Sequence, residues 1–565
     1  MLCWLREMRA VFGALLVLSL AIQSTACLAE KAEHGGVEVL IEGSPIQGAN
    51  GMAADPGAGI WVASVLGGRL VHLSVTGKIK EVRGLELGVE TPDDITFGPD
   101  GTQYFTNFYS GTVVAIDPDG IHRKVADVGV GANPIAFTRD GTRLFVGRCF
   151  FGDALYEIDT AGEFELRLVA ENLSEGAGCG ANGMAFGPDG LLYAPQTLAG
   201  RLIRIHPDSG EREVLHSDVG PLFNGVAFHP RTDELFGVSG NQVLLFDLEA
   251  GERKVVAEMP HVLDKLVFDG AGRLFVSSFA TGEIWEVYRG GGTRAVRSDV
   301  LAAPQGLALA PDGKHLFVAS GPLVLVVDTA TGDMERELPW AGFLAMSLHL
   351  SADQQVLVGA SSGDNVVAGL DPETGEVQFA HHDFSAPVDA LLLPDGTLVV
   401  AEAGGTVVRV GADDTTVRET LANELGQPAG LLWANDALFV ADYLAGKVYR
   451  LMQAGEVLSA PELVLQGLEG PEGLAMIEDG MLLVAEAGLA QVTAYDLETG
   501  VGQKQMQLAA ETGRTIPGFP PSQLHHGVAA GPGGVYVADN VANKVLRLGA
   551  RGCPGGYRAK RRRRR

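Results

Sequence analysis

The chain repeats one short unit, which is clearest between Cys179 and Pro195. It reads as a strand over 184–186, a Pro-Asp-Gly turn, and a second strand over 191–194. In such a turn Pro presets φ, Asp bonds back to the backbone, and Gly takes the positive φ that ends it. A polar residue, Asn182, stands where the first strand begins. We call the residue at this position of every unit the anchor.

The unit occurs twelve times, with anchors spaced 40 to 54 residues apart. In chain order the anchors are Asn50, Asp93, Asn133, Asn182, Asn224, Asp264, Gln305, Met346, Val388, Ala429, Glu472 and His526. A period near 40 residues with several short strands per unit is typical of propeller blades. The chain also holds 76 glycines and 27 prolines and shows no long helical pattern. The sequence therefore predicts an all-β fold of twelve four-stranded blades.

Twelve blades exceed the usual size of a closed propeller, which is about four to eight blades. We therefore expect tandem β-propellers, as two six-bladed rings over residues 36–300 and 301–550, with one twelve-bladed ring as the alternative. The last unit ends after its third strand, and an additional strand over 37–41 precedes the first unit. That strand is expected either to complete the twelfth blade or to add an edge to the first ring.

The two ends of the chain differ in composition from the repeats. Residues 1–29 have the pattern of a secretory signal peptide: arginines, a short apolar run, then small residues. The run is too short to cross a bilayer, and no other stretch is apolar enough. The protein is therefore expected to be periplasmic or extracellular, without a transmembrane segment, and lipid attachment at Cys27 is the less favoured alternative. Residues 551–565 form a basic tail, which is expected to be disordered.

The formal net charge of −28 makes nucleic acid and anionic membranes poor partners. Cleavage of the signal peptide would leave Cys149, Cys179 and Cys553. The loops that lead into first strands share one face of a ring with the loops between second and third strands, and we call this the top face. Cys149 and Cys179 lie on such loops in adjacent blades, so they are expected to pair in an oxidising compartment.

The six anchors of the first ring are all Asn or Asp, and the inner strands direct them toward the ring axis. Carboxylate and amide oxygens are the ligands that calcium prefers. The second-ring anchors, under the same fold constraints, show no such pattern. The sequence therefore favours a divalent metal site, best suited to Ca²⁺, in the first ring, with a water-filled channel as the alternative.

The Asn-Gly-Met and Asn-Gly-Val anchors, followed by Phe-Gly-Pro-Asp-Gly turns, resemble the six-bladed superfamily of SMP-30/gluconolactonase, strictosidine synthase-like, paraoxonase and NHL-repeat proteins. This resemblance implies a channel calcium held by an acid, two Asn and an Asp. The matching residues of this chain are Asp93, Asn182, Asn224 and Asp264, with Asn133 in the skipped blade. Asp93 replaces the family's Glu, and the set is shifted by one blade.

The resemblance further implies that the metal polarises an ester or lactone carbonyl and that Asp264 acts as base or nucleophile. His261, three residues before Asp264, is a candidate proton acceptor, and His216 is a second one. For both, the alternative is an ordinary loop histidine. Phe150 and Phe151 are among the aromatic residues expected to wall an apolar pocket on the top face.

Two function hypotheses follow. The first is an exported calcium-dependent hydrolase of the lactonase or esterase type, acting on a small molecule at the top of the first channel. The second is a non-catalytic tandem propeller that binds a protein or glycan ligand, with a structural metal. In the second ring, Glu472 and His526 form a weaker candidate site.

Overall fold

The computed structural model describes residues 36–176, 178–298, 301–342, 344–454, 457–478, 480–510 and 526–549. The expected signal peptide, Cys27, Cys553 and the basic tail lie outside these residues. Within them, no helix is long and apolar enough to cross a membrane. The described chain folds into twelve antiparallel sheets, eleven of four strands and one of five, together with the short 3-10 helices η1 (Leu85–Leu87) and η2 (Ala487–Leu489).

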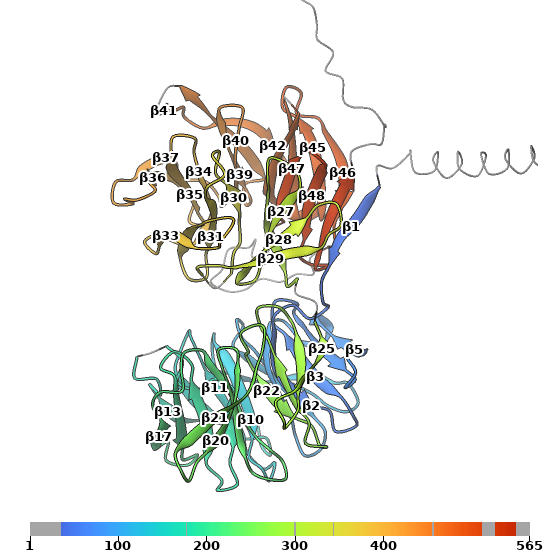
Figure 1. Cartoon of the computed structure of the whole chain (residues 1–565), viewed down its shortest axis with the longest axis vertical. Coiled ribbons are helices and arrows are strands. Elements are labelled where there is room, and N and C mark those ends of the chain that lie inside the picture. The colour runs from blue at the N-terminus through green and yellow to red at the C-terminus, as the bar shows by residue number, and fades with distance from the viewer. Residues whose placement is uncertain are drawn as a thin grey trace, which may run out of the picture.

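The first ring, the lower one in Figure 1, has six blades of four consecutive strands each. Its first three blades are β2 (Ala49–Ala54), β3 (Ile60–Ser64), β4 (Arg69–Leu73), β5 (Ile79–Arg83); β6 (Pro92–Phe97), β7 (Gln103–Asn107), β8 (Thr112–Ile116), β9 (His122–Asp127); β10 (Ala132–Phe137), β11 (Leu144–Arg148), β12 (Ala154–Ile158), β13 (Leu166–Glu171). The next three are β14 (Ala185–Phe186), β15 (Leu192–Gln196), β16 (Arg201–Ile205), β17 (Arg212–His216); β18 (Phe223–Phe228), β19 (Leu235–Ser239), β20 (Gln242–Asp247), β21 (Glu252–Glu258); β22 (Leu266–Phe268), β23 (Leu274–Ser277), β24 (Ile284–Val287), β25 (Thr293–Arg297).

The second ring also has six blades. Its first three are β26 (Pro304–Leu309), β27 (His315–Ser320), β28 (Leu323–Asp328), β29 (Met334–Pro339); β30 (His349–Leu350), β31 (Leu357–Ser361), β32 (Val366–Leu370), β33 (Val377–His381); β34 (Pro387–Leu392), β35 (Thr397–Glu402), β36 (Thr406–Gly411), β37 (Glu419–Ala422). The last three are β38 (Pro428–Ala434), β39 (Ala437–Asp442), β40 (Lys447–Ala454), β41 (Val457–Leu458), β42 (Glu462–Gln466); β43 (Pro471–Glu478), β44 (Met481–Glu486), β45 (Gln491–Asp496), β46 (Gly502–Gln507); β47 (Val528–Gly531), β48 (Gly534–Asp539), β49 (Lys544–Gly549) with β1 (Val37–Glu42).

Each ring closes on itself. In the first ring β22 contacts β2, and the Ser277 hydroxyl donates a hydrogen bond of 2.9 Å to the Asn50 carbonyl across this seam. In the second ring β26 contacts β47 and β48. The expectation of tandem six-bladed propellers is therefore confirmed, and the single twelve-bladed ring is wrong.

The N-terminal strand belongs to the second ring. β1 pairs antiparallel with β49, from Val37 opposite Leu548 to Glu42 opposite Lys544, so it completes the twelfth blade. In Figure 1 this blue strand lies beside the red strands of the upper ring. The first ring is thus inserted between the outermost strand of a second-ring blade and the rest of that ring. Residues 37–42 therefore do not belong to the first ring, in contrast to the expected division at 36–300.

One buried asparagine holds both linkers that join the rings. The Asn543 side-chain amide donates to the carbonyls of Ser44 at 2.5 Å and Leu301 at 2.9 Å, and its Oδ1 accepts from the Ala303 amide at 2.9 Å. Its own carbonyl accepts from the Gly43 amide at 2.9 Å. Because the two linkers leave the top faces at this point, the rings are tied together at one edge.

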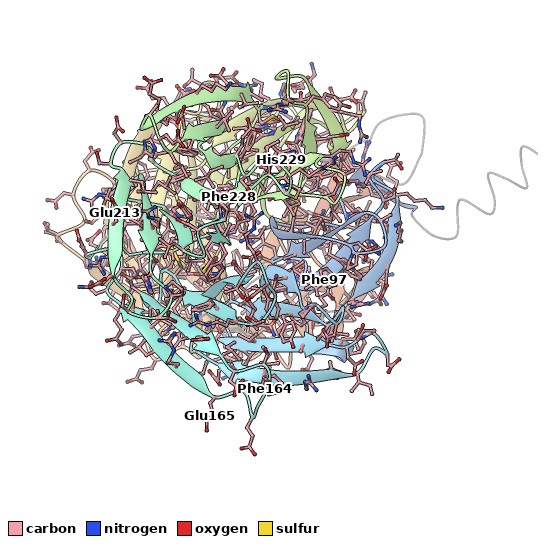
Figure 2. The ribbon with its side chains drawn as sticks, turned by 90° about the horizontal axis from the view of Figure 1, so that it is seen from below. Phe97, Phe164, Glu165, Glu213, Phe228 and His229 are labelled. Atoms are coloured by element: carbon pink, nitrogen blue, oxygen red, sulfur yellow. A yellow bond between two sulfur atoms is a disulfide. The ribbon has the colours of Figure 1, made fainter. Side chains whose placement is uncertain are left out.

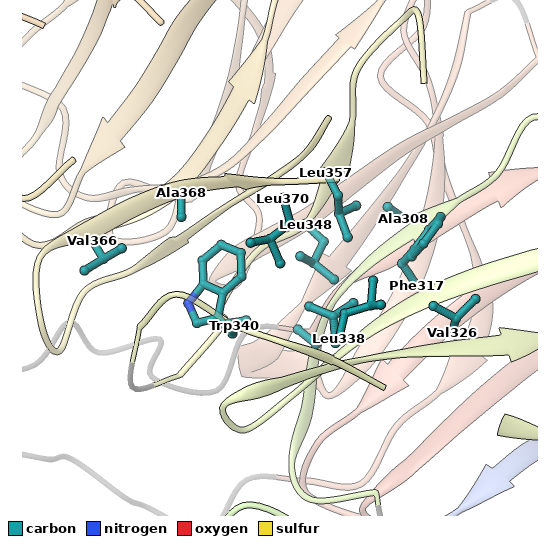
Figure 3. Close-up of a cluster of buried hydrophobic side chains, with 13 residues drawn as sticks. Ala308, Phe317, Val326, Leu338, Trp340, Leu348, Leu357, Val366, Ala368 and Leu370 are labelled. Atoms are coloured by element: carbon teal, nitrogen blue, oxygen red, sulfur yellow. The ribbon is translucent and has the colours of Figure 1, made fainter. Parts of the chain in front are cut away.

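Apolar side chains between facing sheets hold neighbouring blades together. In the cluster of Figure 3, Trp340 and Leu338 of one second-ring blade pack against Leu348 and Leu357 of the next. In the first ring, aromatic pairs bridge neighbouring blades, for example Tyr104 with Phe137 at 5.3 Å between ring centroids. This packing fixes the inner strands that carry the anchors.

Candidate functional site

The anchors lie where the inner strands depart from regular pairing. The ladder between first and second strands is interrupted between Ala49 and Met52, Pro92 and Ile95, and Ala132 and Ile135. Each interruption spans an anchor, and a bulge of this kind redirects a side chain. The second ring has the same interruption, for example between Pro304 and Leu307. The bulge therefore belongs to the fold, and what differs between the rings is the residue that it presents.

The structure gathers the predicted ligands around the first channel. Asp93, Asn133, Asn182 and Asn224 are buried, and Asp264 is partly exposed. Asn50 joins them, since its side-chain amide donates to Asp93 Oδ2 at 3.1 Å. The Asn224 amide donates to the Leu263 carbonyl at 3.0 Å, which fixes its orientation.

Lys265, a residue that the sequence analysis did not single out, also lies among these anchors. It is 4% exposed, and its ammonium donates to Asn182 Oδ1 and lies 3.4 Å from Asn133 Oδ1. These amides belong to blades on the other side of the channel, so the side chain crosses it. The sequence does carry a signal for it: among the six residues that directly follow the first-ring anchors, Lys265 is the one cation.

Three channel oxygens are buried and, among the described residues, have no hydrogen-bond donor: Asn50 Oδ1, Asp93 Oδ1 and Asp264 Oδ2. A buried acceptor without a donor costs free energy, on the order of 1–3 kcal/mol. These oxygens therefore favour a cation or a donor-rich ligand in the channel.

Burial also shifts the acids of the channel. It raises the pKa of Asp93 well above its usual value, opposed by the Lys265 ammonium and reinforced by the Asp264 carboxylate. It raises the pKa of Asp94 and of Asp264 to about 6, again with Lys265 opposing. Lys265 is thus the positive charge that favours the ionised form of these three carboxyl groups.

The five predicted ligands do not fit calcium as a set. The amide oxygens of Asn133 and Asn182 face the Lys265 ammonium, so an ion bound to them would lie next to a fixed positive charge. Two unit charges 4 Å apart repel by about 4 kcal/mol at an effective dielectric constant near 20, and a divalent ion doubles this. Within the described residues, no group of three or more His, Cys, Asp and Glu side chains is arranged to hold a metal ion.

The structure assigns His261 to the junction between the rings. Its Nδ1 lies 2.6 Å from Glu283 Oε2 in the first ring, and its Nε2 lies 2.6 Å from Glu337 Oε2 in the second ring. The hydrogen bonds to Glu283 and Glu337 raise the pKa of His261 to about 9. Because both ring nitrogens are engaged and the imidazole is charged at neutral pH, His261 is not retained as a proton acceptor. His216 packs on the Phe246 ring at 5.2 Å, as an ordinary buried histidine does.

A cavity of about 450 Å³ lies in the first channel on the side away from the top face. Its walls come from the inner strands of all six blades, namely Met52, Ile95, Ile135, Met184, Val226 and Leu266. Asp94 and Lys265 are its buried charged residues. Figure 2 looks onto this lower face, where Phe97 and Phe228 lie nearer the middle of the ring than Phe164 and Glu213. Lys265 therefore lies between this cavity of mixed polar and apolar lining below and the polar anchors above.

The top face carries the aromatic residues expected there. Cys149 and Cys179 form a disulfide with their Cα atoms 4.5 Å apart, and Phe150 and Phe151 follow it directly. Each of these phenylalanines is 48% exposed, and Phe150 has a left-handed backbone with φ of 64°. Phe108 packs beneath both, with ring centroids 6.3 and 5.8 Å away. The disulfide thus fixes an exposed aromatic patch beside the channel mouth.

The second channel is built differently. His526 Nδ1 lies 2.9 Å from Glu472 Oε2, and the His526 backbone amide donates to the same oxygen. Both residues are almost fully buried. His349 Nε2 lies 2.8 Å from Asp389 Oδ1. Among the described residues these are histidine–carboxylate pairs, and they differ from the ring of Asn and Asp anchors in the first channel.

No protein-family model matches the chain, and no curated protein matches it. Similar solved structures include a virginiamycin B lyase from Staphylococcus aureus, at 15% identity over 50% of this chain and 96% of that chain, with a TM-score of 0.36. A gluconolactonase from Xanthomonas campestris is 19% identical over 44% of this chain and 88% of that chain, with a TM-score of 0.35. The extracellular domain of a one component system from B. thetaiotaomicron is 11% identical over 90% of this chain and 82% of that chain, with a TM-score of 0.34. At such identities and scores these structures carry nothing about chemistry, and export from the cytoplasm stays a prediction.

Proposed function

We propose that the first ring hydrolyses ester or lactone bonds of a small molecule bound in its channel. The observation that carries this proposal is the position of the Lys265 ammonium, between the polar anchors and a cavity of about 450 Å³ with both polar and apolar lining. Small-molecule sites are commonly cavities of this volume that combine apolar side chains with a few fixed polar groups. The ester or lactone class comes from the resemblance of the anchors to the gluconolactonase-type propellers.

In this proposal Lys265 binds the substrate carbonyl oxygen and stabilises the negative charge that develops on it. Asp264, partly exposed and with a pKa near 6, accepts a proton from water while the water oxygen attacks the carbonyl carbon. When the carbon–oxygen bond of the ester breaks, Asp264 returns that proton to the leaving alkoxide. The products are a carboxylic acid and an alcohol, and no oxidant or reductant is required.

The test is a panel of lactones and aryl esters, assayed with the full-length protein in the presence of a chelator. Lys265→Met and Asp264→Asn are each expected to lower kcat/KM at least 100-fold. The matched control is Lys254→Met, since Lys254 is an exposed lysine on β21 of the same ring. Unchanged turnover in Lys265→Met, or an equal loss in Lys254→Met, would contradict the proposal.

A second candidate function is non-catalytic binding of a protein or glycan. It is favoured by the exposed apolar residues on top-face loops, namely Phe150, Phe151, Leu198, Leu222 and Val262. Exposed apolar patches of this kind often mark binding sites. Binding to a peptide or glycan array that is lost in Phe150→Ser/Phe151→Ser, together with no turnover on the panel, would favour this second function over hydrolysis.

A further inference from the structure

The side chain of Lys265 crosses the first channel past Gly183, whose lack of a side chain leaves room for it. A Cβ atom on Gly183 would meet Lys265 Cδ at 3.0 Å. Gly183 also has a φ of 49°, where glycine is favoured over other residues. The backbone of the fourth blade is thus shaped to let the lysine side chain of the sixth blade pass it.

The lysine ends among oxygens that would otherwise suit a metal ion. Its ammonium lies at the amide oxygens of Asn133 and Asn182, two of the five predicted calcium ligands. Asp93 and Asp264 each add a buried oxygen with no donor among the described residues. All of these groups are oxygen acceptors, which is the donor set that a hard cation requires.

The negative charges around the first channel also favour one bound cation. Asp93 and Asp94 are buried around the channel, Asp264 is partly exposed there, and the charge of Lys265 acts on all three. A buried cluster of carboxylates without a cation is strongly disfavoured. An ammonium and a divalent ion cannot share the two amide oxygens, because their repulsion at such a distance is large.

We propose that Lys265 is an internal cation that takes the place of a divalent metal ion in the first ring. The amide oxygens of Asn133 and Asn182 therefore need no divalent metal, and removal of the ammonium opens a divalent cation site made of Asp93, Asn133, Asn182 and Asp264. This inference concerns the same channel as the proposed hydrolysis, but it concerns cation binding and holds whether or not the protein is an enzyme.

The experiment is a calorimetric titration of Ca²⁺ into chelator-stripped full-length protein, with Tb³⁺ luminescence as a second readout. Lys265→Ala is expected to bind one ion at least 100-fold more tightly than the wild type. The double variant Lys265→Ala/Asn182→Ala is expected to lose that site, and Lys254→Ala is expected to behave as the wild type. No substrate is present, so failure here is distinct from failure of the hydrolase assay.

Two results would overturn the inference. One is tight binding of a single Ca²⁺ ion by the wild type that disappears in Asn182→Ala. The other is a folded Lys265→Ala protein that gains no affinity. If Lys265→Ala does not fold, the melting temperature of the wild type is the deciding measurement. A wild-type melting temperature that changes neither with chelator nor with added Ca²⁺ supports the internal cation. A wild-type melting temperature that rises with Ca²⁺, and does not rise in Asn182→Ala, contradicts it.

Discussion

The two rings share one fold but present different residues to their channels. In the first ring every anchor is Asn or Asp, and five of these six side chains lie buried around Lys265. In the second ring the anchors are Gln305, Met346, Val388, Ala429, Glu472 and His526. Since both rings have the same bulge at the anchor, the fold alone does not require carboxamides there. The polar set of the first ring is therefore a candidate for function.

In contrast to the anchors, one carboxylate makes the same backbone contacts in both rings. Asp94 accepts from the amides of Ile95 at 2.9 Å and Ile135 at 3.2 Å, which links two neighbouring inner strands. Asp389 occupies the matching position of the second ring and accepts from Ala390 at 2.8 Å and Leu431 at 2.6 Å. A contact made identically in both rings serves the fold. The comparison thus separates structural acids from those specific to the first channel.

The largest expected effect contrasts Asp264 with Glu472, a buried acid of the second channel. Asp264→Asn is expected to lower kcat/KM on the active ester or lactone by about 10²–10⁴-fold, because it removes the proton acceptor. Glu472→Gln is expected to leave turnover unchanged. Steady-state kinetics of both variants, with melting temperatures to verify folding, decide this.

The same Asp264 variant is expected to gain stability near neutral pH. Burial raises the folded pKa of Asp264 from 3.8 to about 6, so its stabilising contribution exists below pH 4 and is lost as the pH rises through 6. An uncharged Asn avoids that cost, on the order of 1–3 kcal/mol. Equal loss of activity and of stability would contradict a functional role for Asp264.

The next effect separates the rings by stability. Deletion of residues 37–42 removes β1, the outer strand of a second-ring blade, and leaves every first-ring blade whole. The second ring is expected to melt about 5–10 °C lower, with the first ring unchanged. Scanning calorimetry or limited proteolysis with fragment mapping measures this. A loss confined to the first ring would contradict the inserted arrangement.

A smaller effect tests the shared carboxylates. Asp94→Asn and Asp389→Asn each remove one acceptor from a pair of buried backbone amides, and each is expected to cost about 1–3 kcal/mol of unfolding free energy, with Asp389→Asn nearer the upper end because it also weakens the His349 contact. Chemical denaturation of both variants measures these costs. Similar values would support a common structural role, whereas a strong effect in only one ring would break the comparison.

The smallest effect concerns the junction. Because the pKa of His261 is raised from 6.5 to about 9, its stabilising contribution is complete below pH 6.5 and is lost as the pH rises through 9. His261→Gln is expected to remove this pH dependence, at a cost on the order of 1 kcal/mol at pH 6. Melting temperatures of both proteins between pH 6 and 10 provide the measurement, and parallel curves would contradict it.

Much of this fold follows from local sequence. The repeated strand–turn–strand units and their spacing predict twelve blades, and the incomplete last unit, with a spare strand at 37–41, admits the closure that β1 provides. The positions of Cys149 and Cys179 on adjacent top-face loops likewise predict their pairing. These features depend on the period and on neighbours along the chain.

The site was less accessible from sequence, since it depends on long side chains and on the second ring. Lys265 reaches from the sixth blade to anchors of the third and fourth, a distance that no local pattern encodes. His261 stands near Asp264 in sequence, but its second partner, Glu337, comes from the other ring. Repeat spacing therefore predicts which residues occupy the anchor positions, and it does not predict the cation that lies among them.

The most direct measurement is X-ray diffraction from crystals of the wild-type protein soaked in Tb³⁺, whose anomalous signal locates bound ions. The account predicts density for the Lys265 ammonium between Asn133 and Asn182 and no anomalous peak there. A strong peak among Asp93, Asn182 and Asp264, with Lys265 turned away, would contradict the central claim that the first channel carries its own cation.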